Sequence, residues 1–253
     1  MAENGLNCAD SGATIMREST SVNPTYQGQF GPFTVNDHDR REVILYRTGL
    51  ALAAGGFSLG VALALAQPFQ PLAVNLHLAT ACFWLMTGGL GLSLWTIHIY
   101  LVVLHRTLQI FWAIGTTAAL YFSFAYPGIL VTTVYDQPWT ILGIGFTFAA
   151  LTGIFFKEAF CFNRLETKFL TAIIPLLLLG HLAGILPLTV AKGGLVSASV
   201  LFLIFVARKV MQPLDPDIGD KSVFTYLAEQ RKAPKVPFRT CLESFIPPPK
   251  SHH

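Results

Sequence analysis

Three histidines, His77, His98 and His181, are the residues of this chain best suited to hold a metal-bearing ring. A neutral imidazole is an axial ligand for haem iron, and it can hold the central magnesium of a chlorophyll in the same way. His77 and His181 lie inside long apolar stretches, where an ionisable side chain is costly and calls for a functional explanation. The three histidines are therefore candidate pigment or haem ligands. The alternative for each is a hydrogen bond to a neighbouring helix.

The depth of two of these histidines allows a paired site. His77 lies about five residues inside one end of its stretch and His181 about nine residues inside the end of its own, so both fall within about 6 Å of the same depth. A haem held by both would require their helices to touch. His98 and His105 are two helical turns apart and share a helix face, which favours lipid headgroups, a partner protein or the edge of a pigment. No nearby Cys, Asp or Glu completes a metal site, so we expect no metal centre.

Motifs of known reactions are missing from the sequence. It contains no nucleophile elbow, no zinc-binding HExxH, no phosphate-binding Walker loop and no glycine-rich dinucleotide turn. The four cysteines are far apart in the sequence and lack the spacing of zinc sites or redox dithiols. We therefore expect no catalytic residues and a protein that is not an enzyme.

The composition places these residues in a lipid environment. The 253 residues are 53% apolar and only 12% charged, with a mean hydropathy of +0.54, whereas soluble domains carry roughly 25% charged residues. A soluble globular enzyme is excluded on this ground, and the 20 phenylalanines exclude a disordered chain. The net charge of +3 is explained by basic residues near a membrane, so no nucleic-acid partner is expected.

The apolar pattern predicts an all-α polytopic membrane protein, a bundle of six transmembrane helices. A bilayer core of about 30 Å needs about 20 apolar residues in a helix. The predicted spans are 44–66, 72–94, 107–126, 139–160, 169–190 and 194–211. The uncharged run from Leu72 to Leu104 would reach about 50 Å as one helix, so we expect a break near Leu94. Trp95, His98, Tyr100 and His105 would then form a short amphipathic piece at the membrane surface.

The positions of the charges predict the orientation and the domains. Of 17 Lys and Arg residues, only Lys192 falls in a predicted outer loop, so both termini should face the cytoplasm or the stroma. Arg47 and Lys157 should extend toward water from the inner boundary. The chain divides into a polar segment 1–43, a membrane domain 44–211 and a soluble tail 212–253 with one short helix from Lys221 onward.

Short connections and small residues predict how the helices pack. The five residues between the first two spans and the three between the last two make each pair antiparallel neighbours. Gly56 and Gly60 should allow a close helix contact. The aromatic segment 26–33 should dock, either on this protein or on a partner, because it resembles neither a solvated tail nor a regular helix.

Six blocks of sequence resemble a known family. They are YQGQFGP (26–32), REVILYR (41–47), GLGLSLWTIHIY (89–100), ALTGIFFKEAFCFNRLE (150–166), LGHLAG (179–184) and DIGDKSVF (217–224). Together they resemble an integral-membrane family of cyanobacteria and plastids that is known only as a domain of unknown function. The resemblance covers most of 25–225 and implies a six-span thylakoid protein associated with early photosystem II assembly intermediates. It implies no ligand residues.

Three functional hypotheses follow. The first is a non-catalytic thylakoid auxiliary protein that binds a photosynthetic complex or its pigments during assembly, with photosystem subunits or assembly proteins as partners and chlorophyll as the cofactor. The second is a small transporter or channel, which would need a path lined by polar groups; the hydroxyls within the spans are isolated. The third is a redox protein whose haem is held by His77 and His181.

Overall fold

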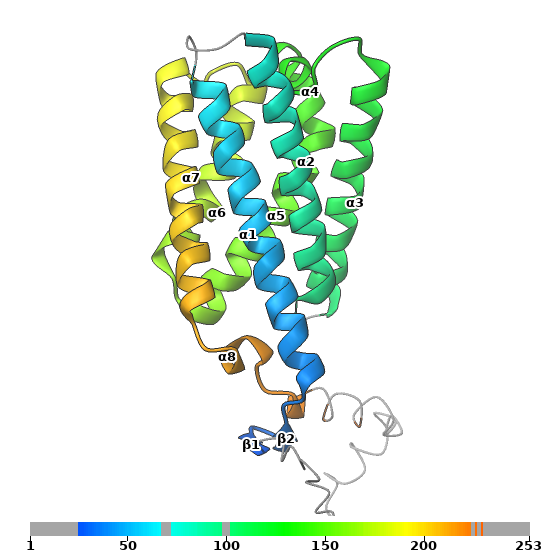
Figure 1. Cartoon of the computed structure of the whole chain (residues 1–253), viewed down its shortest axis with the longest axis vertical. Coiled ribbons are helices and arrows are strands. Elements are labelled where there is room, and N and C mark those ends of the chain that lie inside the picture. Colours follow the sequence, from blue (N-terminus) through cyan, green and yellow to red (C-terminus); the bar gives the residue numbers. More distant parts are fainter. Residues whose placement is uncertain (1–24, 67–71, 98–101, 224–225, 227–228, 230–253) are drawn as a thin grey trace, which may run out of the picture.

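The structure is a computed structural model, and it describes residues 25–66, 72–97, 102–223, 226 and 229. Six long helices run side by side in one bundle (Figure 1). They are α1 (Asp37–Leu65), α2 (Leu72–Thr96), α3 (Val102–Ala125), α5 (Ile141–Phe162), α6 (Leu165–Leu182) and α7 (Leu188–Met211). Helix α1 begins and α7 ends at the same end of the bundle. We call it the hairpin end, because a β-hairpin formed by the residues before α1 lies beyond it, and we call the opposite end the far end.

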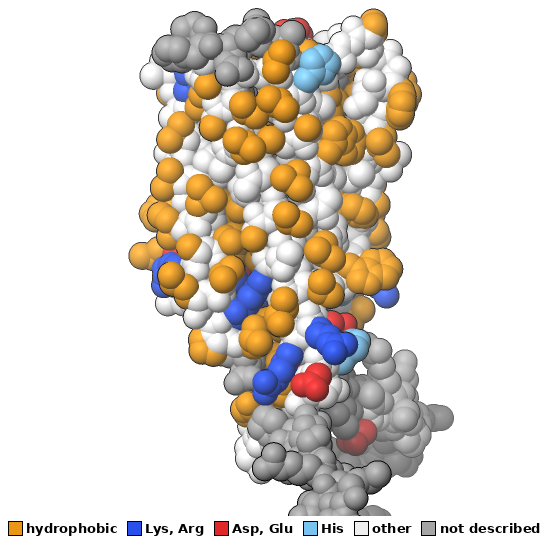
Figure 2. Space-filling model, in the orientation of Figure 1, with side chains coloured by type: hydrophobic (Ala, Val, Ile, Leu, Met, Phe, Trp, Pro, Cys, Tyr) orange, Lys and Arg blue, Asp and Glu red, His pale blue; other side chains and the backbone are white. Residues whose placement is uncertain are grey.

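The predicted membrane fold is confirmed. Among the described residues, these six helices are long and apolar enough to cross a bilayer. Figure 2 shows that Lys, Arg, Asp and Glu side chains on this face gather mainly toward the hairpin end, while apolar side chains cover the length of the bundle. Exposed apolar side chains along a bundle are the surface that lipid tails solvate. The protein is therefore an all-α polytopic integral membrane protein.

Helix α1 begins earlier than the apolar pattern predicts. Its N-cap is Asn36, whose side chain accepts a hydrogen bond from Asp39 N–H at 2.9 Å, while the Asp39 carboxylate accepts one from Asn36 N–H at 3.0 Å. This reciprocal capping box starts the helix at Asp37, two turns before the predicted 44. The polar segment therefore contributes the first turns of α1.

The expected surface helix between the second and third spans is wrong in part. Helix α2 continues to Thr96, and α3 begins at Val102, so Trp95 and His105 belong to the long helices themselves. The His105 ring nitrogen Nε2 lies 2.7 Å from the carbonyl oxygen of Leu94, which links the two helices. His98 and Tyr100 lie outside the described residues.

The connection between α6 and α7 lies earlier than predicted. Helix α6 ends at Leu182, Gly184 adopts a φ of +67°, and Pro187 is the N-cap of α7. A glycine at such a φ is a common helix stop, and a proline cannot continue a helix across it. His181 therefore lies one residue from the end of its helix instead of about nine, and Lys192 lies in the second turn of α7 and not in a loop.

The predicted loop between α3 and α5 contains a short helix. Helix α4 (Leu130–Asp136) and a 3₁₀ turn, η1 (Pro138–Thr140), fold back at the far end of the bundle (Figure 1). The hydropathy pattern did not separate seven residues of helix from a loop. This helix forms part of the cavity described below.

Close packing of glycines joins α1 to α2 as antiparallel neighbours, as predicted. A Cβ on Gly56 would lie 2.6 Å from the carbonyl oxygen of Cys82, and one on Gly89 would lie 2.6 Å from the carbonyl oxygen of Gly49. Helix association in lipid depends on such close backbone approach. The fully buried side chains of Leu50, Leu90 and Phe155 form part of the core beside this seam.

The aromatic N-terminal segment is a β-hairpin. Strands β1 (Thr25–Gly28) and β2 (Gly31–Thr34) pair antiparallel, with Tyr26 opposite Phe33, and Gly31, the first residue after the turn, takes a φ of +134°. The hairpin lies beyond the hairpin end, near the short helix α8 (Asp215–Ile218) (Figure 1). Its partner is this chain, as the contacts below show.

Candidate functional site

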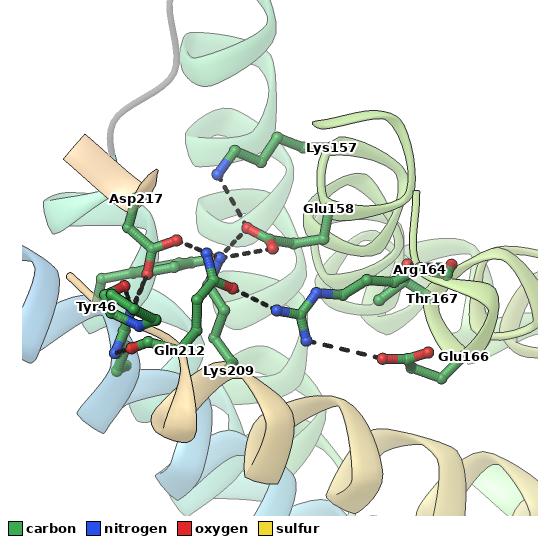
Figure 3. Close-up of polar contacts among 11 residues, drawn as sticks. Tyr46, Lys157, Glu158, Arg164, Glu166, Thr167, Lys209, Gln212 and Asp217 are labelled. Atoms are coloured by element: carbon green, nitrogen blue, oxygen red, sulfur yellow. Dashed lines mark hydrogen bonds and ion pairs between the residues drawn. The ribbon is translucent and has the colours of Figure 1, made fainter. Parts of the chain in front are cut away.

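A buried carboxylate, Glu158, lies at the centre of the hairpin end. It is 0% exposed and comes from the last turns of α5. One of its oxygens accepts hydrogen bonds from the Tyr46 hydroxyl and the Lys157 ammonium, both at 2.9 Å. Its other oxygen accepts one from Lys209 Nζ at 2.7 Å (Figure 3). Helices α1, α5 and α7 thus meet at one charge.

Lys209 joins this carboxylate to the segment that follows α7. Its Nζ lies 2.6 Å from Oδ1 of Asp217 in α8, and 4.0 Å from the centre of the Phe162 ring. Asp217 Oδ2 accepts hydrogen bonds from Nε and Nη2 of Arg47 at 2.9 and 2.7 Å. Arg47 also donates to the carbonyl oxygens of Gln212 and Pro213. The turn after α7 is therefore fastened to α1.

A second group of charged side chains lies beside the first, near the connection between α5 and α6. Arg164 donates to the Gln212 side-chain oxygen, and its Nη1 lies 3.8 Å from Glu166. Glu166 also accepts two hydrogen bonds from Arg208, at 2.9 and 3.0 Å. We use the name charge network for the following residues: Tyr46, Arg47, Lys157, Glu158, Arg164, Glu166, Arg208, Lys209, Gln212 and Asp217.

The charge network was missed by the sequence reasoning, and the expectation for two of its members is wrong. Arg47 is 7% exposed and the Lys157 side chain 10%, so neither extends toward water. Each has a buried carboxylate partner, Asp217 for Arg47 and Glu158 for Lys157, which compensates its charge inside the protein. The available signal was the presence of Glu158 and Glu166 at the same helix ends as the basic residues.

The β-hairpin docks on the segment that follows α8. Gln29 N–H donates to the Asp220 carboxylate at 2.6 Å, and Phe30 N–H donates to the Ser222 hydroxyl at 3.0 Å. The Phe30 ring stacks on Tyr226 with 4.1 Å between centroids. Hydrogen bonds from the Ser222 side chain and from Gln29 N–H hold the pKa of Asp220 below its ordinary value. Of the two docking partners considered, this chain itself provides the surface.

An apolar cavity of about 580 Å³ lies at the far end, between α1, α2, α4, α5, α6 and α7. Along α1 it extends from Gly56 to Leu65, about 14 Å of helix. Its walls are built of aliphatic and phenylalanine side chains. Among the described lining residues, polar side-chain atoms come from Thr132, Tyr135, His181 and Lys192. This size and lining are typical of small-molecule sites.

His181 is the candidate ligand that reaches this cavity. Its ring stacks on Tyr135 of α4, with 5.5 Å between centroids and 26° between planes. Its ring makes no hydrogen bond to another described residue. The ring therefore retains its capacity to bind a ligand, although its place at the end of α6 was not foreseen.

The other two histidines do not join His181 within the described structure. His77 is exposed on α2, and the residues of α2 that line the cavity are Leu76, Ala79, Phe83 and Met86. His98 lies outside the described residues. Their roles as pigment or haem ligands stay predictions.

Within the part of the chain that the structure describes, one group of side chains has the spacing of metal ligands. Ligand atoms of His38, Asp39 and Glu42 lie within 4.8 Å of one another at the start of α1. The Asp39 carboxylate already accepts the capping bond and pairs with Lys221 at 2.8 Å. The geometry is accounted for by the helix start, so we assign no metal there.

Six membrane-length helices with a buried charge network at one end and an apolar cavity at the other define a polytopic integral membrane protein. The chain belongs to the family described as uncharacterized integral membrane protein (DUF2301), whose profile matches residues 92–226. The matched region includes most of the charge network, His181 and Lys192. No curated protein and no solved structure matches the chain.

Proposed function

We propose that this protein is a non-catalytic pigment carrier of the photosynthetic membrane. In this proposal the cavity takes a chlorophyll or a related chlorin, and His181 binds the central metal through a ring nitrogen. The carrier binds a photosynthetic complex while that complex is assembled, and the complex that we propose is photosystem II. The observation that carries the proposal is one imidazole on the wall of a mostly apolar cavity.

The chemistry of the cavity supports a ring-shaped apolar ligand. Burial of apolar surface supplies most of the binding free energy in such a site, and a few polar groups fix the orientation. A neutral imidazole is a suitable axial ligand, and stacking on Tyr135 holds the His181 ring in one orientation. The bound pigment would supply light absorption, and the protein would supply the ligand and a water-poor surrounding.

The thylakoid location and the photosystem partner rest on the sequence blocks quoted above and on their resemblance. In this proposal both termini face the cytoplasm or stroma, because the exposed Arg40, Arg41 and Lys168 gather at the hairpin end. The docked hairpin would then offer the exposed Phe30 and Tyr226 edges to an assembly partner on that side.

The two other hypotheses gain less support. A transporter needs a continuous polar path, whereas four lining residues with polar side chains are found in the described cavity. A haem held by two histidines would need His77 beside His181, and His77 is exposed on α2.

The experiment is purification in mild detergent from a chlorophyll-producing host, with an absorbance scan and identification of the bound subunits. We expect chlorin absorbance and photosystem subunits in the wild-type preparation. His181→Leu should lose the absorbance, whereas His77→Leu, which alters an exposed histidine outside the cavity lining, should keep it. A colourless wild-type protein without photosystem subunits would contradict the proposal.

A further inference from the structure

Lys192 is a basic residue at the far end of the bundle. The other Lys and Arg side chains of the described chain belong to segments at the hairpin end, from Arg40 at the start of α1 to Lys221 after α8. Lys192 is exposed, lies in the second turn of α7, and lines the same cavity as His181. Among the described residues, Lys192 is the basic side chain that borders this apolar cavity.

The surroundings of Lys192 leave its charge available. None of the ion pairs among the described residues involves it, and Asp136, the acidic residue at the end of α4, makes no ion pair with it. The N-terminus of α7, four residues earlier, adds positive potential because the first N–H groups of a helix lack intrahelical partners. Both effects favour an anionic group at the mouth of the cavity.

The position of Lys192 relative to His181 defines the ligand further. The two residues come from consecutive helices joined by the five residues 183–187, and both border one cavity. A ligand that fills the cavity therefore meets an imidazole on the wall and an ammonium at the mouth. A chlorin with a free propionate combines a metal for the first group with a carboxylate for the second.

We propose that the cavity takes a chlorin that carries a free carboxylate, and that Lys192 binds this carboxylate. This inference rests on the proposed function, and it narrows the ligand to the acid form, which exists before a hydrocarbon tail is esterified to the carboxylate or after that tail has been removed. The ion pair with Lys192 and the bond from the metal to His181 would be two fixed contacts, which together set the orientation of the chlorin ring.

The test compares two ligands that differ in one charge, chlorophyllide a and its methyl ester. Both are titrated into the purified protein in neutral detergent, so that no lipid phosphate competes for Lys192, and binding is followed by the shift of the chlorin absorbance bands. We expect the acid to bind the wild-type protein about fivefold more tightly than the ester, as for a single ion pair exposed to water. Added salt should reduce this ratio.

Three variants test whether Lys192 causes the preference for the acid over the ester. Lys192→Gln should bind acid and ester equally, and Lys192→Arg should keep the preference for the acid. Lys168→Gln removes an exposed lysine at the hairpin end and should leave the ratio unchanged.

The outcomes separate the two proposals. Equal binding of acid and ester to the wild-type protein, or an acid preference that survives in Lys192→Gln, would overturn the carboxylate proposal and leave pigment binding intact. If neither chlorin binds the wild-type protein, the pigment proposal fails and the carboxylate proposal fails with it.

Discussion

The two ends of the bundle use polar side chains in opposite ways. At the hairpin end the carboxylates of Glu158, Glu166 and Asp217 are buried and ion-paired, and together they join α1, α5, α6, α7 and α8. At the far end His181 and Lys192 border an apolar cavity without a hydrogen bond or ion pair to another described residue. Fully paired buried charges fix a structure, whereas unpaired groups on a cavity wall are available to a ligand. The hairpin end therefore holds the helices together, and the far end is where we propose that a ligand binds.

The largest expected effect is at the charge network. Glu158→Gln keeps the size of the side chain but leaves Lys157 and Lys209 buried without their shared carboxylate. Removal of one partner from a buried ion pair costs about 3 to 5 kcal/mol, so we expect a loss of that order in the free energy of unfolding, measured by denaturant titration in mixed micelles. Asp136→Asn, an exposed acid at the far end, is the control and should change it by less than about 0.5 kcal/mol. Equal free energies of unfolding for the two variants would show that Glu158 does not hold the helices together.

A smaller effect is expected at the helix seam that connects the two ends. Gly89→Ala would place a Cβ 2.6 Å from the carbonyl oxygen of Gly49 and 2.7 Å from the backbone nitrogen of Ala53. Overpacking of this kind costs about 1 to 3 kcal/mol, again measured as unfolding free energy. Gly88→Ala is the matched control, because a Cβ there meets no atom of the described residues within 4 Å. Equal free energies of unfolding for the two variants would contradict the close contact between α1 and α2 at Gly89.

At the far end we expect a change in binding with little change in stability. Ala64→Phe fills part of the cavity that Ala64 lines, so the affinity for a chlorin should fall at least about tenfold, as expected for loss of about 1.4 kcal/mol of binding free energy. The control is Ala62→Phe, which alters an exposed residue of α1 outside the described lining. Absorbance titration measures both, and an unchanged affinity in Ala64→Phe would place the ligand elsewhere.

The smallest effect concerns the docked hairpin and its pH dependence. Because the pKa of Asp220 is lower in the folded state than its ordinary value of 3.8, its contribution to docking is complete above that value and is lost as the pH falls through the folded pKa. The protection factor of Gln29 N–H, which is its intrinsic hydrogen-exchange rate at each pH divided by its observed rate, should therefore fall as the pH drops through the folded pKa of Asp220. Asp220→Asn should show the lower protection factor already at neutral pH, and a protection factor that is independent of both pH and the substitution would contradict the docking role.

The sequence predicted the six helices and the α1–α2 contact because length, hydropathy and small residues are local properties. It misplaced helix ends where a cap decides, as at Asn36, or where Gly184 and Pro187 interrupt an apolar run. The charge network was not predicted because Tyr46 and Lys209, two of the partners of Glu158, lie far from it in the sequence. The one signal in the sequence was that acidic and basic residues share the same helix ends. His181 was identified from its type, but the cavity beside it depends on how five of the long helices and α4 diverge at the far end.

The most direct test of the different roles of the two ends is a density map of the protein purified in mild detergent from chlorophyll-producing membranes. We expect a flat ligand between α1, α4 and α6, with its metal bonded to a ring nitrogen of His181, and a charge network at the hairpin end that holds no ligand. A cavity filled by lipid chains, or a pigment bound on the outside of the bundle, would contradict these roles.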